Sequence, residues 1–193
     1  MNEKQNALNI VICGVGGQGT LLASRILGHM AVSLGHDVKV SEVHGMSQRG
    51  GSVITYFRMG EKVYSPMIEQ KGADYVLAFE ELEALRDLTY LKDGGTLIVN
   101  TQQILPLPVI IGAAKYPEHP LETLKSRADV VALDALPMAE KAGNARAVNT
   151  VLLGALAKRL HFDKALWLDA LRACVPARFL ESNLLAFESG YNA

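Results

Sequence analysis

The chain is poor in cysteine, the residue that iron–sulfur clusters need as a ligand. Among its 193 residues only Cys13 and Cys174 are cysteines, and no Cys-x-x-Cys pair occurs. The chain alone therefore lacks the four thiolates of an iron–sulfur cluster or of a cysteine-type zinc site. Its five histidines are scattered, without a His-Glu-x-x-His sequence, so we predict no metal site. We expect both thiols to be reduced core residues.

The sequence also lacks a long run of charge of one sign. Its formal net charge is −1, from 19 basic and 20 acidic side chains. Nucleic acids are bound mainly through clustered Lys and Arg, so this balance predicts no nucleic-acid partner. No apolar stretch reaches the roughly 20 residues that span a bilayer, and residues 1–6 contain no apolar part of a signal peptide. We therefore expect a cytoplasmic protein without membrane contact.

What the chain does contain is an alternation of short apolar runs and segments of helical periodicity. Strands are predicted at residues 9–13, 37–41, 74–79, 96–100 and 130–134. Helices are predicted over residues 20–34, 80–91, 121–126, 138–141, 147–160, 164–174 and 179–188. This order indicates an α/β, Rossmann-like fold with a mostly parallel sheet and a helical C-terminal region. No repeat or linker divides the chain, so residues 1–193 are predicted to form one domain.

Two segments depart from this alternation. Residues 51–58 are predicted as a strand that turns at 59–61 and returns through 62–64, which would make a short antiparallel addition to the sheet. Residues 101–120 hold four of the seven prolines, and within them we predict a strand or extended segment at 109–111.

A glycine-rich turn follows the first predicted strand and precedes the first predicted helix. It reads Gly-Val-Gly-Gly-Gln-Gly, which matches the Gly-x-Gly-x-x-Gly pattern of dinucleotide-binding turns. Gly14 would permit the tight turn, Gly16 the approach of a phosphate, and Gly19 the close packing of helix on strand. The candidate binding residues here are Gly14, Gly16, Gly17, Gln18 and Gly19. The turn either holds an anionic ligand at the helix N-terminus or is purely structural.

A second glycine-bearing segment, residues 44–51, follows the second predicted strand and reads His-Gly-Met-Ser-Gln-Arg-Gly-Gly. The carboxyl ends of neighbouring strands meet at one edge of a sheet, so the two loops are predicted to form one site. Glu42 precedes the second loop, and it stands either where a ribose-binding acid is expected or as a solvated carboxylate at the strand end.

Residues 14–19 followed by residues 42–52 closely resemble the gamma-type domains of 2-oxoacid:ferredoxin oxidoreductases, and among these the beta subunits of the indolepyruvate-oxidising enzymes. The resemblance continues through residues 63–68, 73–74, 79–86 and 144–155 and covers nearly the whole chain. Residues 1–193 are thereby identified as a single pyruvate/ketoisovalerate oxidoreductase gamma-type domain. The second loop is the specific part of this resemblance.

The resemblance implies a two-subunit enzyme that oxidatively decarboxylates an arylpyruvate to its acyl-CoA and passes electrons to ferredoxin. Thiamine diphosphate, Mg²⁺ and [4Fe–4S] clusters would lie on a large alpha subunit, with CoA as co-substrate. This chain alone would bind none of these cofactors and would be inactive. Indolepyruvate, phenylpyruvate and hydroxyphenylpyruvate all remain possible substrates.

The resemblance also suggests roles for the two loops. Arg49 would pair with a carboxylate or phosphate near the partner's thiamine site, with His44 as a second catalytic candidate. The candidate binding residues of this part are Glu42, Ser47, Gln48, Arg49, Gly50 and Gly51. Alternatively, His44 and Arg49 only form an interface network. The first loop would bind the anionic part of CoA or brace the second loop.

Two other classes of function stay open. The first loop alone would suit a stand-alone NAD(P)- or FAD-dependent oxidoreductase. The second class is a scaffold subunit, which organises its partner without touching substrate. Asn144, Arg146 and Asn149 begin an apolar helical segment, where Asn144 is predicted as a cap.

Overall fold

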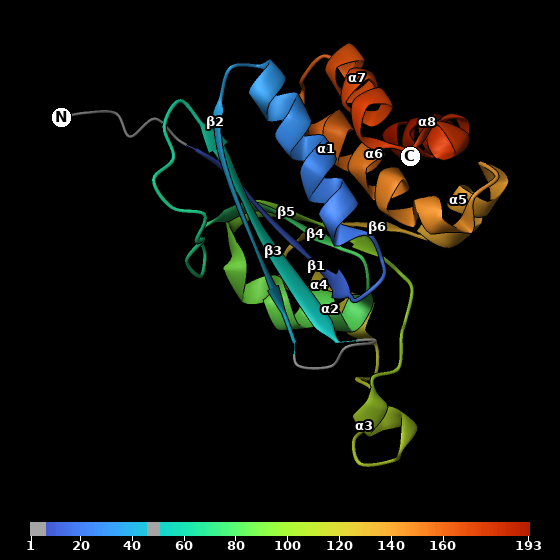
Figure 1. Ribbon diagram of the computed structural model, residues 1–193. Helices are drawn as coiled ribbons and strands as arrows, with labels where there is room; N and C mark the ends of the chain where they lie inside the picture. The colour runs from blue at the N-terminus through green and yellow to red at the C-terminus, as the bar shows by residue number, and fades with distance from the viewer. Residues whose placement is uncertain (1–6, 46–50) are drawn as a thin grey trace.

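The computed structural model describes residues 7–45 and 51–193, which form one six-stranded sheet covered by helices on both faces (Figure 1). Its strands lie in the order β2-β3-β1-β4-β5-β6. They are β1 (Leu8–Val15), β2 (Asp37–His44), β3 (Ser52–Gly60), β4 (Ala73–Ala78), β5 (Leu91–Asn100) and β6 (Asp129–Leu133). The pairs β1–β4, β4–β5 and β5–β6 are parallel. These strands are short apolar runs because both faces of the sheet are buried.

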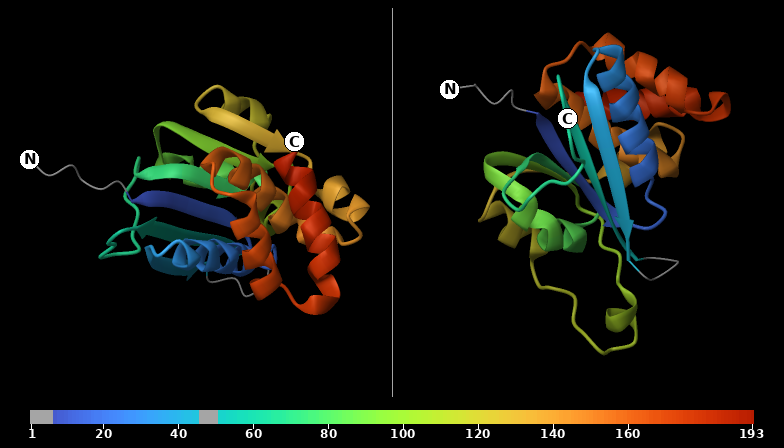
Figure 2. Two further views of the ribbon diagram at one scale, coloured as in Figure 1. Left: turned by 90° about the horizontal axis from the view of Figure 1, so that it is seen from above. Right: turned by 60° about the vertical axis from the view of Figure 1, so that its left-hand side comes forward.

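The helices divide between the two faces of the sheet (Figures 1 and 2). One face carries α1 (Thr20–Ser33), α5 (Ala135–Lys141), α6 (Val148–Leu160), α7 (Lys164–Cys174) and α8 (Ala177–Tyr191), and the other α2 (Glu81–Asp87) and α4 (Pro120–Lys125). Successive side chains of a strand point to opposite faces of the sheet. In β1, Ile10 and Ile12 therefore pack in the core under α1 and α5 to α8, whereas Val11 and Cys13 pack in the core under α2 and α4. The helix that follows β1, α1, lies on one face of the sheet, and the helix that follows β4, α2, lies on the other. In α/β folds, ligands bind at the carboxyl ends of two adjacent strands whose connections leave toward opposite faces.

The antiparallel strand lies inside the sheet. β3 pairs antiparallel with β1 on one side and with β2 on the other, over eight residues each. The α/β class with a mostly parallel sheet and a helical C-terminal region is confirmed. The predicted hairpin partner is wrong, because β2 pairs with β3 while residues 62–64 form no strand. The prediction of one site formed by two loops assumes that β1 and β2 are neighbouring strands. That assumption is wrong, because β3 lies between them.

Two further predictions fail in the details. The strand at residues 109–111 is wrong, because the segment forms the short helix α3 (Leu107–Ile110), with proline in its first turn. The helix predicted over residues 80–91 ends earlier and passes through the 3-10 turn η1 (Leu88–Tyr90) into β5. A second 3-10 turn, η2 (Ala145–Ala147), leads into α6. Among the helices formed by residues 7–45 and 51–193, none combines the length and the hydrophobicity that a membrane span requires.

The C-terminal helices α6 and α8 cross in direct backbone contact. A Cβ atom on Gly154 would lie 2.1 Å from the carbonyl oxygen of Phe187, and one on Gly190 would lie 1.8 Å from that of Val151. Trp167 of α7 is fully buried with its ring centroid 6.1 Å from that of Phe187. This packing holds the start of α6 at the carboxyl edge of the sheet, beside the glycine turn.

Candidate functional site

The glycine turn between β1 and α1 is held by the side chain of Gln18. Its Oε1 accepts the N–H of Val15 at 2.7 Å, and its Nε2 donates to the carbonyl of Phe79 at 2.9 Å. Gly14 leaves room for this amide, because a Cβ there would lie 2.8 Å from Gln18 Oε1 and 3.0 Å from Phe79 Cβ. Gln18 therefore ties the end of β1 to the end of β4.

Two glycines of the turn adopt left-handed backbone conformations but face different surroundings. Gly17 (φ 99°) faces open space, with no atom within 4 Å of the place of a Cβ. At Gly19 (φ 87°) a Cβ would lie 2.5 Å from Nδ2 of Asn149, which donates to the Gly19 carbonyl at 3.2 Å. Gly19 thus allows α1 to start close against α6. The N–H of Gly16 donates to the carbonyl of Gly51 at 2.9 Å.

Among residues 7–45 and 51–193, no hydrogen-bond acceptor is found for the first backbone N–H groups of α1. No side chain caps it at Gly19, and its first turn contains no acidic residue. The first N–H groups of a helix lack intrahelical acceptors and carry a partial positive charge. This end of α1 can therefore donate to an anion.

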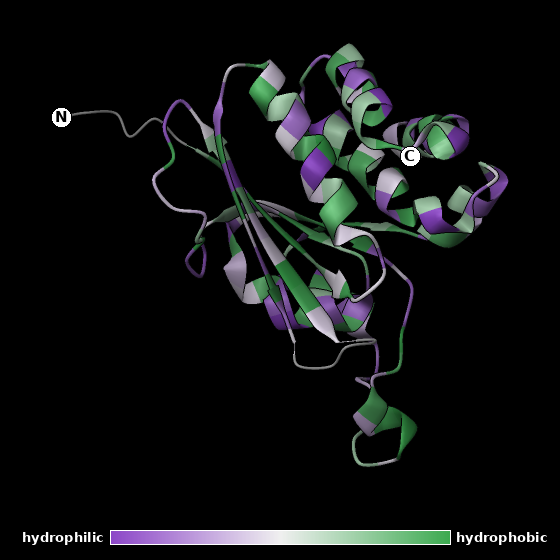
Figure 3. Cartoon of the chain, viewed as in Figure 1, coloured by the Kyte–Doolittle hydropathy of each residue, from purple (hydrophilic) through white to green (hydrophobic). Residues whose placement is uncertain are grey.

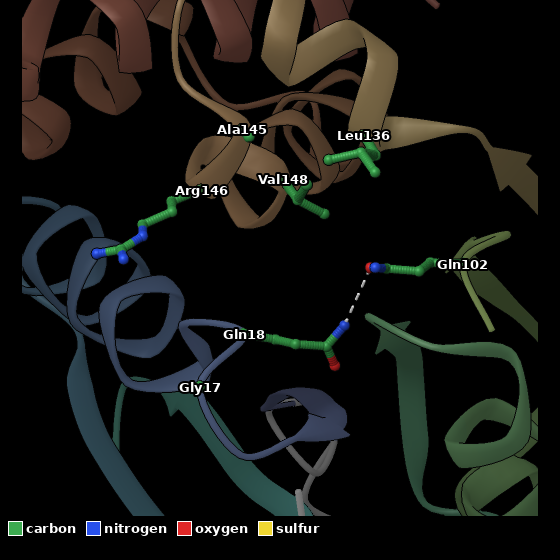
Figure 4. Close-up of a pocket in the computed structure, with 7 residues that line it drawn as sticks. All are labelled: Gly17, Gln18, Gln102, Leu136, Ala145, Arg146 and Val148. Atoms are coloured by element: carbon green, nitrogen blue, oxygen red, sulfur yellow. Dashed lines mark hydrogen bonds between the residues drawn. The ribbon is translucent and has the colours of Figure 1, made fainter. Parts of the chain in front are cut away.

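A cavity of about 340 Å³ opens beside the turn (Figure 4). It is lined by Gly17 and Gln18 of the turn, Gln102 after β5, Leu136 of α5, and Ala145, Arg146 and Val148 where α6 begins. Gln18 Nε2 lies 3.5 Å from Gln102 Oε1, so two amides form one wall. Figure 4 shows the Arg146 guanidinium extending toward α1. The cavity combines two amide side chains and one cationic side chain next to the turn that leads into α1.

Sequence reasoning missed most of this cavity. Arg146 was noticed only as part of a helix start, and the Asn144 side chain does accept the Arg146 N–H at 3.0 Å, as a cap does. Gln102 and Leu136 were not singled out, because they follow different strands and carry no local pattern. The one available signal was a cation between two asparagines ahead of an apolar helix.

The ends of the second loop lie against the first. The N–H of Gly45 donates to the carbonyl of Ser52 at 2.8 Å, and Gly51 accepts from Gly16. The hydroxyl of Ser52 also donates to buried Glu83 of α2, at 2.5 Å. The predicted site residues Ser47, Gln48, Arg49 and Gly50 lie outside the described residues. The structure therefore brings the ends of both loops together.

Glu42 is engaged by its own chain. Its Oε2 accepts the hydroxyls of Thr55 at 2.9 Å and Thr20 at 3.3 Å, and its Oε1 lies 2.8 Å from His44 Nε2. The Glu42 side chain is only 10% exposed, so it is not the solvated carboxylate considered above. Because both oxygens already have partners and β3 stands between β1 and β2, Glu42 braces α1 against β3.

The start of α2, behind the two loops, contains buried carboxylates. Glu80 caps α2 by accepting the N–H of Glu83 at 2.9 Å, and it also accepts the N–H of Ile104 at 3.1 Å and the hydroxyl of Tyr116 at 2.6 Å. These three donors offset the desolvation of a fully buried carboxylate. Glu80 is therefore a structural anchor between α2 and the chain that follows β5.

Asp87, at the end of α2, has a buried oxygen Oδ2 without a partner among the described residues. Burial, and then the nearby charge of Glu83, raise the pKa of Asp87 to about 6. Burial is also the main cause that raises the pKa of the neighbouring Cys13 thiol well above its usual range. Such a thiol is unreactive. Both cysteines are free thiols, as predicted; Cys13 lies in the core, whereas Cys174 is only partly buried, so the prediction of a core position is wrong for Cys174.

No metal centre can be assembled from the described residues. Across 7–45 and 51–193, no three His, Cys, Asp or Glu side chains are grouped so that they could hold an ion.

Comparison with known proteins places this architecture among relatives. Residues 9–193 match the family described as pyruvate ferredoxin/flavodoxin oxidoreductase. The chain is 44% identical over 193 residues to indolepyruvate oxidoreductase subunit IorB of Thermococcus kodakarensis, covering 96% of this chain and 95% of that protein.

Two solved structures share the fold. The gamma subunit of a keto/oxoacid ferredoxin oxidoreductase from Geobacter sulfurreducens has a TM-score of 0.71 and 24% identity, covering 96% of both chains. The 2-oxoglutarate:ferredoxin oxidoreductase of Magnetococcus marinus, solved with 2-oxoglutarate, coenzyme A and succinyl-CoA, has a TM-score of 0.75 and 19% identity. That match covers 98% of this chain but 31% of the longer chain.

Proposed function

The chain belongs to the pyruvate ferredoxin/flavodoxin oxidoreductase family, and we propose that its own complex oxidises an arylpyruvate such as indolepyruvate. It is a small subunit of a 2-oxoacid:ferredoxin oxidoreductase. The observation that carries the substrate proposal is the 44% identity to an indolepyruvate oxidoreductase subunit over almost the full length of both proteins. We place the reaction, the oxidative decarboxylation of the 2-oxoacid to its acyl-CoA with electrons passed to ferredoxin, in the cytoplasm.

The redox cofactors are proposed to lie on a large alpha subunit. Two cysteines, one deep in β1 and one in α7, cannot hold a [4Fe–4S] cluster. Among the described residues, no three His, Cys, Asp or Glu side chains are grouped as metal ligands, which supports a Mg²⁺ site on the partner rather than on this chain. Thiamine diphosphate would supply carbanion stabilisation from the partner. This chain would contribute binding and positioning.

We propose that the cavity beside the glycine turn binds an anionic part of CoA. The N–H groups at the start of α1 and the Arg146 guanidinium would donate to phosphate oxygens, as helix N-termini and arginines commonly do. The amide nitrogen of Gln102 would donate to polar atoms farther along the ligand, beside Gln18, whose own amide is bonded to Val15 and Phe79. The cavity lies at the carboxyl ends of the strands, where α/β folds bind their ligands.

His44 and Arg49 are proposed to reach toward the partner's thiamine site. His44 is largely exposed at the end of β2, and its Nε2 lies next to Glu42. Arg49, with Ser47, Gln48, Gly50 and Gly51, keeps the anion-binding role that the resemblance implies.

The test is co-expression of this chain with a large subunit that carries thiamine and ferredoxin-type cysteine motifs. The purified complex is assayed for CoA-dependent ferredoxin reduction with indolepyruvate, phenylpyruvate, hydroxyphenylpyruvate and, as a control, pyruvate. We expect activity only with both chains and CoA, and a preference for the arylpyruvates. A complex active on pyruvate alone would refute the substrate proposal.

The same preparation separates the alternative functions. Turnover by the lone chain with NADH, NADPH or FAD would establish a stand-alone oxidoreductase and overturn the proposal. The contacts of Glu42 argue against that alternative, because its oxygens are not free for a ribose. If Arg49→Ala and Arg146→Ala changed only assembly and never the kinetics with arylpyruvate or CoA, the chain would be a scaffold subunit.

A further inference from the structure

A projecting segment leaves the body of the molecule at the edge that carries the candidate site. We call residues 103–116, which include α3, the arm; Figure 1 and the right-hand view of Figure 2 show it extending past the ends of β2 and β3. Its large exposed aliphatic side chains are Leu105, Leu107, Ile110 and Ile111. Figure 3 shows the helix of the arm as hydrophobic. Isolated exposed aliphatic residues are ordinary, but several together on one projection mark a contact surface.

The base of the arm is held firmly. Its two ends, Ile104 and Tyr116, both donate to Glu80, and the Gln103 amide donates to Glu81 Oε2 at 2.7 Å. Burial and the hydrogen bond to Glu80 raise the pKa of Tyr116, so its hydroxyl stays a neutral donor. The arm is therefore anchored at both ends to the start of α2.

The tip of the arm is closed by its own backbone. The carbonyl of Pro108 accepts from Ala113 and Ala114 at 2.8 and 3.0 Å, and that of Pro106 accepts from Ile110 at 3.1 Å. Proline restricts the backbone further. A segment already ordered in this way loses less conformational entropy when it binds. The arm thus presents a preformed apolar surface.

We propose that the arm docks its aliphatic tip into an apolar groove of the large, cofactor-bearing subunit of the same complex. This inference rests on the proposed function. A subunit that completes the site must approach the edge from which the arm projects. In the Magnetococcus enzyme, the part that matches this fold is 31% of one longer chain. The fold therefore also occurs covalently joined to other parts of a 2-oxoacid:ferredoxin oxidoreductase. Lys115 is the only charged residue from 102 to 116, which suits an apolar groove.

The experiment compares lysines on the arm with a matched lysine elsewhere. Ile110→Lys and Ile111→Lys alter side chains that are 65% and 68% exposed. The control is Val32→Lys, where valine is 64% exposed near the end of α1, at the opposite edge of the sheet. The dissociation constant of each co-expressed complex is measured by analytical ultracentrifugation over a dilution series.

We expect each arm lysine to raise the dissociation constant at least about tenfold, as at a buried apolar anchor. Val32→Lys should leave it within about twofold, and all three free chains should keep their melting temperatures within about 2 °C, because the sites are exposed. Alanine at both isoleucines tests the same contact without adding charge, with an expected weakening of about tenfold.

Two results would overturn the inference. One is arm variants whose affinity for the large subunit stays within about twofold of the wild type. The other is a free chain that self-associates through the arm, with lysine abolishing the dimer and leaving subunit affinity unchanged. Activity of the wild-type complex separates this inference from the proposed function. A tight complex without 2-oxoacid activity refutes the function and leaves the docking inference standing.

Discussion

The glycine turn and the arm leave the same edge of the sheet, but they place their polar groups differently. In the turn, Gln18 and the N–H of Gly16 are bonded to the protein, while among the described residues no side chain caps the start of α1. In the arm, the polar groups are bonded at the base and the tip is aliphatic. The difference indicates that the glycine turn suits a small anion, whereas the arm suits a protein surface.

Each element depends on one buried polar side chain. Gln18 is neutral, whereas Glu80 is a fully buried acid that needs its three donors. Bonds to an ionised acceptor are stronger than those between neutral groups, and an acceptor left unsatisfied costs more. The arm should therefore respond sharply to the loss of one donor, while the turn should respond mainly to changes of shape.

We expect the greatest loss of stability from a substitution at one of two glycines within the turn. Gly19→Ala combines a left-handed backbone with a 2.5 Å approach to Asn149, whereas Gly17→Ala meets open space. We expect losses in the free energy of unfolding of about 3 and about 1 kcal/mol, or roughly 6–12 °C and 2–4 °C in melting temperature. Thermal melts monitored by circular dichroism measure both. Equal losses would mean that contact with α6 does not define the turn.

The next prediction concerns the base of the arm. Tyr116→Phe removes one of the three donors to Glu80, and hydrogen bonds to charged groups are worth about 1.5–3 kcal/mol. We expect faster hydrogen exchange at arm amides and an affinity for the large subunit that is weaker by about three- to tenfold. Tyr64→Phe, at a tyrosine that is 88% exposed, is the control and should change neither. Unchanged exchange in the arm would show that Glu80 does not order it.

On the turn side, Arg146→Ala tests the proposed anion site. Loss of a guanidinium–phosphate contact should raise KM for CoA about tenfold, with kcat within about twofold, because the group binds and does not react. Steady-state kinetics of the complex at varied CoA measure this. Arg172→Ala, which removes an α7 arginine paired with Asp169, is the matched control. Equal KM values in both variants would remove the cavity from the CoA site.

The smallest expected effect is a pH dependence at α2, the helix that supports the arm. The pKa of Asp87 is raised to about 6 from an ordinary 3.8, so the folded chain binds this proton more tightly than the unfolded chain. The resulting stability is complete below about pH 4 and is lost as the pH rises through about 6. Asp87 is only partly buried, so solvent screening weakens this linkage to about a third of its full size, and Asp87→Asn should raise the melting temperature by about 3 °C at about pH 8 and leave it unchanged at about pH 4. An equal rise in melting temperature at both pH values would contradict a role for the ionisation of Asp87.

Local patterns were sufficient for most of the strands and helices. Apolar β-branched runs predicted β1, β4, β5 and β6 within a few residues, and helical spacing predicted α7 at residues 164–174. The segment at residues 109–111 was mistaken for a strand, because an apolar run with prolines has no periodicity that tells a short helix from an extended chain.

The α/β class, the glycine turn and the family can be predicted from the amino-acid sequence alone, because each depends on residues that are adjacent or regularly spaced. The folded structure was needed to show that β3 lies between β1 and β2, that Thr20 and Thr55 both bond to Glu42, and that Arg146 lines the same cavity as the glycine turn. These features join residues far apart in the chain, and strand order and side-chain partners depend on which apolar faces pack together. The arm belongs to the second group, since its exposure is a property of the folded surface.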